Sequence, residues 1–375
     1  MMDEYFRLGP TGLRVSPLGL GTMTFGAAGW HAGEDAARAI FRRYLDRGGN
    51  FVDTADVYSS GAAEELLGRL IRETGARDRL VLATKFGGPT DPTDPNARGN
   101  GRKHMLAALD ASLRRLGTDH LDLYWLHLWD RVNGPEEVMA TFDALVRSGK
   151  VRAAGLSNVP AWWAAKAQTL ALHRGWEPVA ALQLEYSLIE RTLEFEHLPA
   201  ALDLGLSIVP WSPLGNGLLT GKYPRAIGPG AGRLAPGSGS PLPVDPDDRA
   251  IGPGAGRLAP GSGWPLPVDP DERQWGIVDA LRSVAADLGR SPAQVALRWL
   301  VDRPAVTGTL IGATTVEQLD ANLAALSFEL PRELRERLDA ASAPAALTTP
   351  HSLFARFPAP PRTVRPSAYG AAPHR

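Results

Sequence analysis

Short apolar runs alternate along this chain with longer segments in which apolar residues recur every three or four positions. The short runs predict buried strands, and the longer segments predict amphipathic helices. We expect strands at 17–21, 50–53, 80–84, 121–126, 151–156, 180–184, 206–210 and 308–312. The helical patterns lie near 35–47, 61–73, 103–116, 135–147, 160–174, 191–204, 273–302 and 315–326. This alternation predicts a parallel sheet, because each parallel return needs a crossover connection.

Eight such units favour closure into a (β/α)8 barrel over an open sheet. A doubly wound sheet would place a glycine-rich phosphate loop after its first strand, and Gly19-Leu20-Gly21 lacks the third glycine of that motif. Residues 5–16 predict a small β-hairpin that turns at Gly9-Pro10-Thr11-Gly12. We expect residues 1–342 to form one α/β barrel domain.

Two segments interrupt the alternation. Residues 225–248 recur almost unchanged at 249–272, with Ser240 replaced by Trp264 and Asp248 by Glu272. The unit is rich in glycine and proline and has no periodicity, so 225–272 is expected to be a tandemly duplicated flexible loop after the seventh barrel strand. Residues 343–375, rich in alanine, proline and arginine, predict an irregular tail.

The composition narrows the classes of function. The 40 basic and 41 acidic residues nearly cancel, so no bulk charge attracts nucleic acid or an anionic membrane. The chain has no cysteine, which excludes disulfides and thiolate chemistry. The first ten residues lack the apolar core of a signal peptide, and no apolar run is long enough to span a bilayer. We therefore expect a cytoplasmic protein without nucleic-acid or membrane partners.

Four polar residues follow successive predicted strands. Asp53 ends the second strand, and Tyr58 lies in the loop behind it. Lys85 follows the third strand directly, and His127 follows the fourth. Because the active sites of (β/α)8 barrels lie at the carboxyl ends of the strands, these four side chains are expected to converge on one face.

The four residue types suit acid–base chemistry. A phenol with a pKa of about 10 exchanges protons poorly near neutrality, and an adjacent ammonium lowers that pKa. A buried ammonium in turn needs a carboxylate, which Asp53 would supply. His127 would donate a hydrogen bond that orients a bound carbonyl. Taken singly, each residue also has an ordinary structural role, such as a backbone contact or a satisfied core histidine.

At these residues the sequence resembles the aldo-keto reductase family, in the branch similar to aryl-alcohol dehydrogenases. The motifs that carry the resemblance occur in the family's order: YFRLGPTGLRVSPLGLGTMTFG, FVDTADVY, LATKFG, LDLYWLH, GLSN, LQLEYS, PWSPLGNGLLTGKY and LIGATTVEQLDANL. The resemblance implies a barrel that binds NADPH across its mouth and reduces an aldehyde or ketone by hydride transfer from C4 of the nicotinamide. It also implies that Tyr58 is the general acid, that Lys85 and Asp53 tune it, and that His127 orients the substrate.

The resemblance further implies a set of cofactor contacts at the later strand ends. Ser157, Asn158 and Gln183 would bind the nicotinamide carboxamide, although Ser157-Asn158 also suits the start of a helix. Tyr186 would stack on the nicotinamide ring, or pack as a loop aromatic. The complete set is Gly21, Thr22, Met23, Ser157, Asn158, Gln183, Tyr186, Trp211, Ser212, Pro213, Leu214, Gly217, Gly312, Thr314, Gln318 and Asn322.

The segment after the last strand bears on the choice of cofactor. Thr314-Thr315-Val316-Glu317 predicts a capping box that opens a helix, and a helix N-terminus suits the 2′-phosphate of NADPH. Many relatives have an arginine or lysine here, whereas this chain has only the uncharged Thr314, Thr315, Gln318 and Asn322. Neutral donors bind phosphate more weakly than a guanidinium does, so NADPH is expected over NADH by a modest ratio.

The substrate is the least specified part. Met23, Phe25, Trp30 and Trp129 follow the first and fourth strands and would wall an apolar pocket for a small carbonyl compound, or pack the rim. Two other functions stay open. One is a regulatory subunit that binds the cofactor and turns over little, and the other is a phosphate-binding barrel isomerase. The eight histidines show no spacing typical of a metal site. The oligomeric state is left open.

Overall fold

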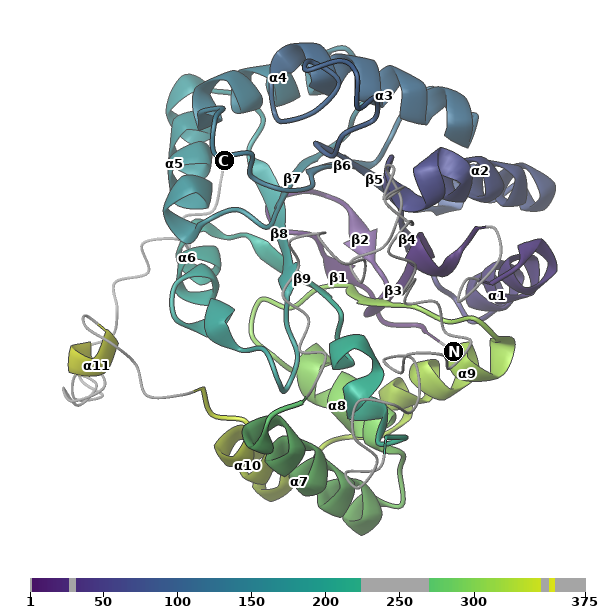
Figure 1. Ribbon diagram of the computed structural model, residues 1–375, viewed down its shortest axis with the longest axis vertical. Helices are drawn as coiled ribbons and strands as arrows, with labels where there is room; N and C mark the ends of the chain where they lie inside the picture. The colour runs from purple at the N-terminus through teal and green to yellow at the C-terminus, as the bar shows by residue number, and fades with distance from the viewer. Residues whose placement is uncertain (1, 27–31, 224–269, 345–350, 355–375) are drawn as a thin grey trace.

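The computed structural model describes residues 2–26, 32–223, 270–344 and 351–354, and these residues form an eight-stranded parallel barrel surrounded by helices (Figure 1). Neighbouring strands pair in the order β10-β3-β4-β5-β6-β7-β8-β9. The ring closes where Ile208 exchanges backbone hydrogen bonds of 2.7 and 2.8 Å with Ala305 and Thr307. The predicted (β/α)8 barrel is therefore confirmed.

The strands are short, as the apolar runs predicted. They are β3 (Leu18–Gly21), β4 (Phe51–Asp53), β5 (Val81–Phe86), β6 (Leu123–Leu126), β7 (Ala154–Ser157), β8 (Val179–Glu185), β9 (Ser207–Trp211) and β10 (Thr309–Ile311). The α-helices are α1 (Glu34–Asp46), α2 (Ala62–Thr74), α3 (Arg102–Leu116), α4 (Pro135–Arg147), α5 (Ala161–Arg174), α6 (His197–Leu204), α7 (Glu272–Leu288), α8 (Pro292–Val301), α9 (Val316–Leu323), α10 (Arg332–Ala341) and α11 (His351–Phe354). No helix in these ranges is both long and apolar enough to cross a bilayer.

Alternate residues of the strands fill two separate cores. The larger core lies between the strands and the surrounding helices and includes Leu20, Val52 and Leu126. A smaller cluster fills the barrel and includes Phe51 and Trp125. The ring of Trp125 lies so close to β7 that a Cβ on Gly155 would come within 2.2 Å of it, so only glycine fits there. The barrel interior is thus packed with side chains.

The predicted hairpin covers the amino end of the barrel. Its strands are β1 (Phe6–Arg7) and β2 (Arg14–Val15), which pair antiparallel. The buried Leu8 and Val15 belong to the cluster inside the barrel. Gly9 has a φ of +52°, and a Cβ there would lie 2.0 Å from the carbonyl oxygen of Ala180, so the turn requires glycine. The amide of Gly9 donates to Ser207 Oγ at 2.8 Å, which fixes the hairpin to β9.

The helices differ from the sequence prediction at four places. One is the short α11, which lies in the segment 343–375 that was predicted to be irregular. The single pattern at 273–302 is two helices, because Gly289 ends α7 in the left-handed region and Ser291 starts α8 with a capping box to Gln294. Helix α6 begins at His197 rather than at 191, after a 3-10 turn at Thr192–Glu194. Helix α10 was not predicted. Its surface is strongly polar, and only Leu338 of its residues is buried.

Most of the duplicated loop, residues 225–269, lies outside the described residues, as does nearly all of the predicted tail. The end of the second copy is described, and it belongs to a helix rather than to a loop. Asp271 is the N-cap of α7 and accepts from the amide of Gln274, whose side chain accepts from the amide of Asp271. Residues 271–272 are therefore the start of α7, which corrects the predicted end of the loop at 272.

Candidate active site

Asp53, Tyr58, Lys85 and His127 meet at the carboxyl end of the barrel. Asp53 ends β4, Lys85 lies near the end of the neighbouring β5, and His127 follows β6. The amide of His127 donates to the carbonyl oxygen of Phe86 at 2.8 Å, which extends the β5–β6 ladder by one residue. Tyr58 begins a 3-10 turn, Tyr58–Gly61, in the loop after β4. Parallel pairing of adjacent strands therefore brings together four residues that are far apart in sequence.

Lys85 is the centre of this group. Its side chain is 1% exposed and forms an ion pair with Asp53. Its ammonium also donates to the carbonyl oxygen of Thr54 at 2.8 Å and to the Tyr58 hydroxyl at 3.1 Å. The three donors of the ammonium are thus all used. Burial opposes the charge of Lys85, but the Asp53 carboxylate and the Tyr58 oxygen outweigh burial and raise the pKa of the ammonium above its ordinary value.

Tyr58 is half-buried, and its turn holds the ring in place. Ser59 and Ser60 have φ values of 47° and 54°, and Gly61 follows with 93°. Two successive non-glycine residues in the left-handed region are costly, and such strain is often found at functional sites. The His127 ring lies edge-on to the Tyr58 ring, with centroids 6.1 Å apart. The phenol thus contacts both a cation and an imidazole.

Gln183 supports Asp53 in this structure. Its Nε2 donates to Asp53 Oδ2 at 3.0 Å, and the Gln183 side chain is buried. The two residues are on opposite strands of the barrel, β8 and β4, so the bond crosses the barrel mouth. Sequence reasoning assigned Gln183 to a cofactor contact alone. Its contact with Asp53 was missed because 130 positions separate the pair.

Ser157, Asn158 and Trp211 form a second polar group at the mouth. Asn158 Nδ2 donates to Ser157 Oγ at 2.9 Å and to the carbonyl oxygen of His127 at 3.0 Å. Trp211 Nε1 donates to Asn158 Oδ1 at 3.1 Å. Helix α5 begins at Ala161 with Pro160 as its N-cap, so the stretch 157–160 does lead into a helix as predicted, but neither Ser157 nor Asn158 caps it. These residues instead connect β6, β7 and β9 beside His127.

The remaining predicted cofactor residues flank the same mouth. Gly21 ends β3, and Thr22 and Met23 belong to the 3-10 turn Thr22–Thr24 behind it. Ser212, Pro213 and Leu214 follow β9 and lead into a 3-10 segment, Gly215–Thr220, that contains Gly217. Gly312, Thr314, Gln318 and Asn322 surround the start of α9 after β10. The structure thus places these residues around one rim, and their cofactor contacts stay predictions.

The start of α9 differs in detail from the predicted capping box. The N-cap is Thr315, which accepts from the amide of Gln318, and not Thr314 paired with Glu317. Gln318 Oε1 accepts from the amide and the hydroxyl of Thr314 at 2.9 and 3.0 Å. Hydrogen bonds from its own amide and from Thr315 lower the pKa of Glu317. The helix N-terminus therefore already stabilises one carboxylate.

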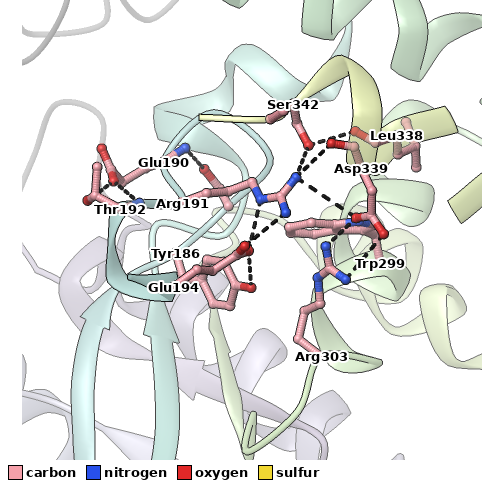
Figure 2. A network of polar contacts seen from close by, with 12 residues as sticks. Tyr186, Glu190, Arg191, Thr192, Glu194, Trp299, Arg303, Leu338, Asp339 and Ser342 are labelled. Atoms are coloured by element: carbon pink, nitrogen blue, oxygen red, sulfur yellow. Dashed lines mark hydrogen bonds and ion pairs between the residues drawn. The ribbon is translucent and has the colours of Figure 1, made fainter. Parts of the chain in front are cut away.

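Tyr186 lies in a different environment from the other predicted contacts (Figure 2). Its ring is fully buried and packs edge-on against Trp299 of α8 at 5.8 Å. Its hydroxyl donates to Glu194 at 2.6 Å. A ring without exposed area offers no face to a nicotinamide in this conformation. The packing alternative fits these contacts, and the stacking role stays a prediction.

The predicted substrate pocket is described only in part. Phe25 has no exposed area, which fits packing beneath the rim. Trp129 is half-buried and meets Trp162 edge-on at 5.7 Å. Trp30 lies outside the described residues. Trp129 is therefore the described aromatic that best fits a pocket wall.

A buried polar group behind the site was missed. Glu64 is fully buried and accepts from Thr84 at 2.6 Å and from Arg115 at 2.6 Å. Asp56 is also buried, and burial together with the charge of Glu64 raises its pKa well above the ordinary value. Neither carboxylate stood out in sequence, since acidic residues near a helix start usually face solvent. The group lies next to Lys85, because the amide of Asp56 donates to the carbonyl oxygen of Lys85 at 3.1 Å.

Comparison with known proteins identifies the family of this chain. The model of the Aldo/keto reductase family matches residues 17–343. An uncharacterized oxidoreductase, YrpG, of Bacillus subtilis is 38% identical, over 90% of this chain and 95% of its own. The versiconal hemiacetal acetate reductase of Aspergillus parasiticus is 31% identical over 92% and 98%, and the aryl-alcohol dehydrogenase [NADP(+)] of Phanerodontia chrysosporium is 31% identical over 88% and 83%. With a match over nearly the whole chain, this protein belongs to the aldo/keto reductase family.

Proposed function

We propose that this protein reduces an aldehyde or ketone to an alcohol, with NADPH as the hydride donor and Tyr58 as the proton donor. The observation that carries the proposal is the hydrogen bond from the buried Lys85 ammonium to the half-buried Tyr58 hydroxyl. Family membership and reductase relatives support carbonyl reduction, and the relative named as NADP-dependent supports this cofactor.

The residues at the mouth fit a nicotinamide cofactor. Ser157, Asn158 and Gln183 offer amide and hydroxyl groups of the kind that bind a carboxamide, and they lie beside His127 and Asp53. The N-terminus of α9 lowers the pKa of Glu317, so it suits the charge of a phosphate as well. When bound, the cofactor would supply a hydride to the carbonyl carbon.

The protein's own residues then handle the proton. Tyr58 gives its hydroxyl proton to the carbonyl oxygen, so the substrate gains one hydride and one proton and leaves as an alcohol. Lys85 donates to the phenolate oxygen that remains and stabilises its charge until solvent returns a proton. Asp53 keeps Lys85 charged, and Gln183 and Thr54 hold the pair in position. His127, at the edge of the Tyr58 ring, donates to the carbonyl oxygen and orients it.

The test is consumption of NADPH with a mixed panel of aldehydes and ketones, in the wild type and in Tyr58→Phe. The substitution removes the acidic hydroxyl and keeps the ring. We expect turnover to be lost while NADPH affinity, from fluorescence titration, changes only a few-fold. Retention of more than about a tenth of the activity, equivalent to about 1.4 kcal/mol, would exclude Tyr58 as the acid. Tight NADPH binding without turnover in the wild type would favour the regulatory alternative.

A further inference from the structure

A charged hollow lies between α2 and α3 on the outer wall of the barrel, where the two helices run side by side (Figure 1). It has a volume of about 430 Å³, is largely open to solvent, and is lined by Glu65, Arg69, Arg72, Arg114 and Arg115. Four guanidinium groups thus surround it with one carboxylate. None of these residues belongs to the rim described above, so the hollow needs its own explanation.

Arg115 is held rigidly in the wall of this hollow. Its Nε donates to the fully buried Glu64, which also accepts from Thr84 at 2.6 Å. Its stem lies against α2 so closely that a Cβ on Gly61 would come within 2.9 Å of Arg115 Cδ. Arg69 forms a partly exposed ion pair of 2.9 Å with Glu34 of α1. Donors that are already ordered lose little conformational entropy when they bind a ligand.

Arg72 and Arg114 add positive charge beyond that of the Arg115–Glu64 and Arg69–Glu34 pairs. Both side chains are exposed, and neither has an ion-pair partner among the described residues. Arg72 Nη1 lies 2.3 Å from the place where a Cβ on Gly117 would stand, at the carboxyl end of α3. Helix carbonyls attract cations there, which explains how both arginines come to lie at one spot. The helix carbonyls do not neutralise the charges of Arg72 and Arg114.

We propose that this hollow binds a small metabolite that carries a diphosphate group. A guanidinium presents parallel N–H groups that match phosphate oxygens. Arg69 and Arg115 already pair with Glu34 and Glu64, so Arg72 and Arg114 are the two guanidiniums left to bind an anion with several charged oxygens. Glu65 is the only acidic group in the lining, and its carboxylate repels the ligand more strongly as the negative charge of the ligand increases.

The experiment is a calorimetric titration of the full-length protein with inorganic pyrophosphate, with orthophosphate as the comparison, at constant ionic strength. We expect saturable binding that is tighter for pyrophosphate. Arg72→Gln/Arg114→Gln should raise the Kd for pyrophosphate at least about tenfold, and Glu65→Gln should lower it about two- to fivefold. Arg115 is left intact because its removal would strand the buried Glu64.

A matched control makes the same charge change elsewhere. Arg7 and Arg14 are exposed and lie opposite each other on the β1–β2 hairpin at the amino end of the barrel. Arg7→Gln/Arg14→Gln should change the Kd less than about twofold. Equal weakening by both double variants, or no saturable binding in the wild type, would overturn the proposal. So would loss of pyrophosphate binding in the presence of saturating NADPH, because it would place the anion at the barrel mouth.

Discussion

Two buried groups of charged side chains, one around Lys85 and one around Arg191, are built from ion pairs and hydrogen bonds but have different roles. At the mouth, Lys85 contacts Asp53, Thr54 and Tyr58, and its last contact is a phenol that remains half-exposed. Beside the loop after β8, Arg191 is 9% exposed and donates through Nε and Nη2 to Glu194 at 2.8 and 2.9 Å (Figure 2).

The other contacts of Arg191 are also with protein groups. Its Nη1 donates to Ser342 Oγ at 2.7 Å and to the carbonyl oxygen of Asp339 at 3.0 Å, both on the last helix of the barrel or directly after it. The Asp339 carboxylate accepts from Trp299 at 2.8 Å and pairs with Arg303. Burial opposes the charge of Arg191, but Glu194 and Asp339 outweigh it and raise its pKa. The comparison teaches that a network whose contacts are all with other protein groups fastens α10 to α8, whereas a network ending in an accessible hydroxyl is available for chemistry.

The strongest test of this contrast removes the cation at the mouth. Lys85→Met keeps the stem and removes the charge, so carbonyl reduction should fall at least about a hundredfold. Asp53→Asn should also reduce it, because Lys85 loses its counter-ion. The double variant should lose less than the product of the two single losses, since one unit is being dismantled. Steady-state rates of the three variants would measure this, and strict additivity would show that the two side chains act separately.

The second test breaks the Arg191 network. Arg191→Met should lower the free energy of unfolding by about 2–3 kcal/mol, because Glu194 and Asp339 lose a partly buried partner. The rate per folded molecule should not change. Urea denaturation and kinetics on the same preparation would measure both. Arg332→Met, which removes an exposed arginine paired with Glu336 on the same helix, is the control and should leave stability unchanged. A large loss of kcat in Arg191→Met would mean that this network also serves the reaction.

The third test concerns charge at the rim. NADPH should bind more tightly than NADH by a modest ratio, since the described segment at 314–322 has no basic residue. Thr314→Arg should widen that ratio about five- to tenfold, because a guanidinium binds phosphate in a bidentate manner. Fluorescence titration with both cofactors measures the ratio, and Thr314→Gln controls for side-chain length. Equal affinity for both cofactors, unaltered by the arginine, would refute the assignment of this segment to the 2′-phosphate.

The smallest effects are expected from the duplicated loop, and the sequence offers a matched pair of deletions. Deleting 249–272 leaves Ser240 and Asp248, and deleting 225–248 leaves Trp264 and Glu272. Deleting 225–248 keeps Asp271 and Gln274, so their capping box at the start of α7 is preserved. Deleting 249–272 joins Asp247-Asp248 to Arg273-Gln274, so Asp247 takes the place of Asp271 in the box. Doubling a flexible loop costs only about 0.6 kcal/mol in closure entropy.

Each deletion should therefore shift the Tm by no more than a few degrees. Cofactor affinity and release rate should change less than about tenfold, or 1.4 kcal/mol. Calorimetry and stopped-flow fluorescence would measure these quantities. If only the variant without Trp264 unfolds, that tryptophan belongs to the core and the surface-loop prediction is wrong.

The barrel was predictable from sequence because its signals are local. Short apolar runs such as Phe51-Val52 mark strands, and their carboxyl ends mark the site, so the group around Lys85 needed no knowledge of distant contacts. The break at Gly289 was missed because apolar periodicity continues on both sides of it, although the capping box from Ser291 was readable. The contact of Gln183 with Asp53 and the burial of Tyr186 against Trp299 were not predictable, since both depend on packing between segments far apart in sequence.

The hairpin at the amino end has a kinetic consequence. With Leu8 and Val15 packed into the barrel and Gly9 fastened to β9, the tube is closed at that end and filled with side chains beyond it. Any molecule that reaches Tyr58 must arrive through the opposite end and depart the same way. In the proposed reaction the cofactor and the carbonyl compound would share this one entrance, so the reactant that lies deeper should bind first and leave last. We therefore expect the order of binding to follow from the closed amino end of the barrel and not from relative affinities.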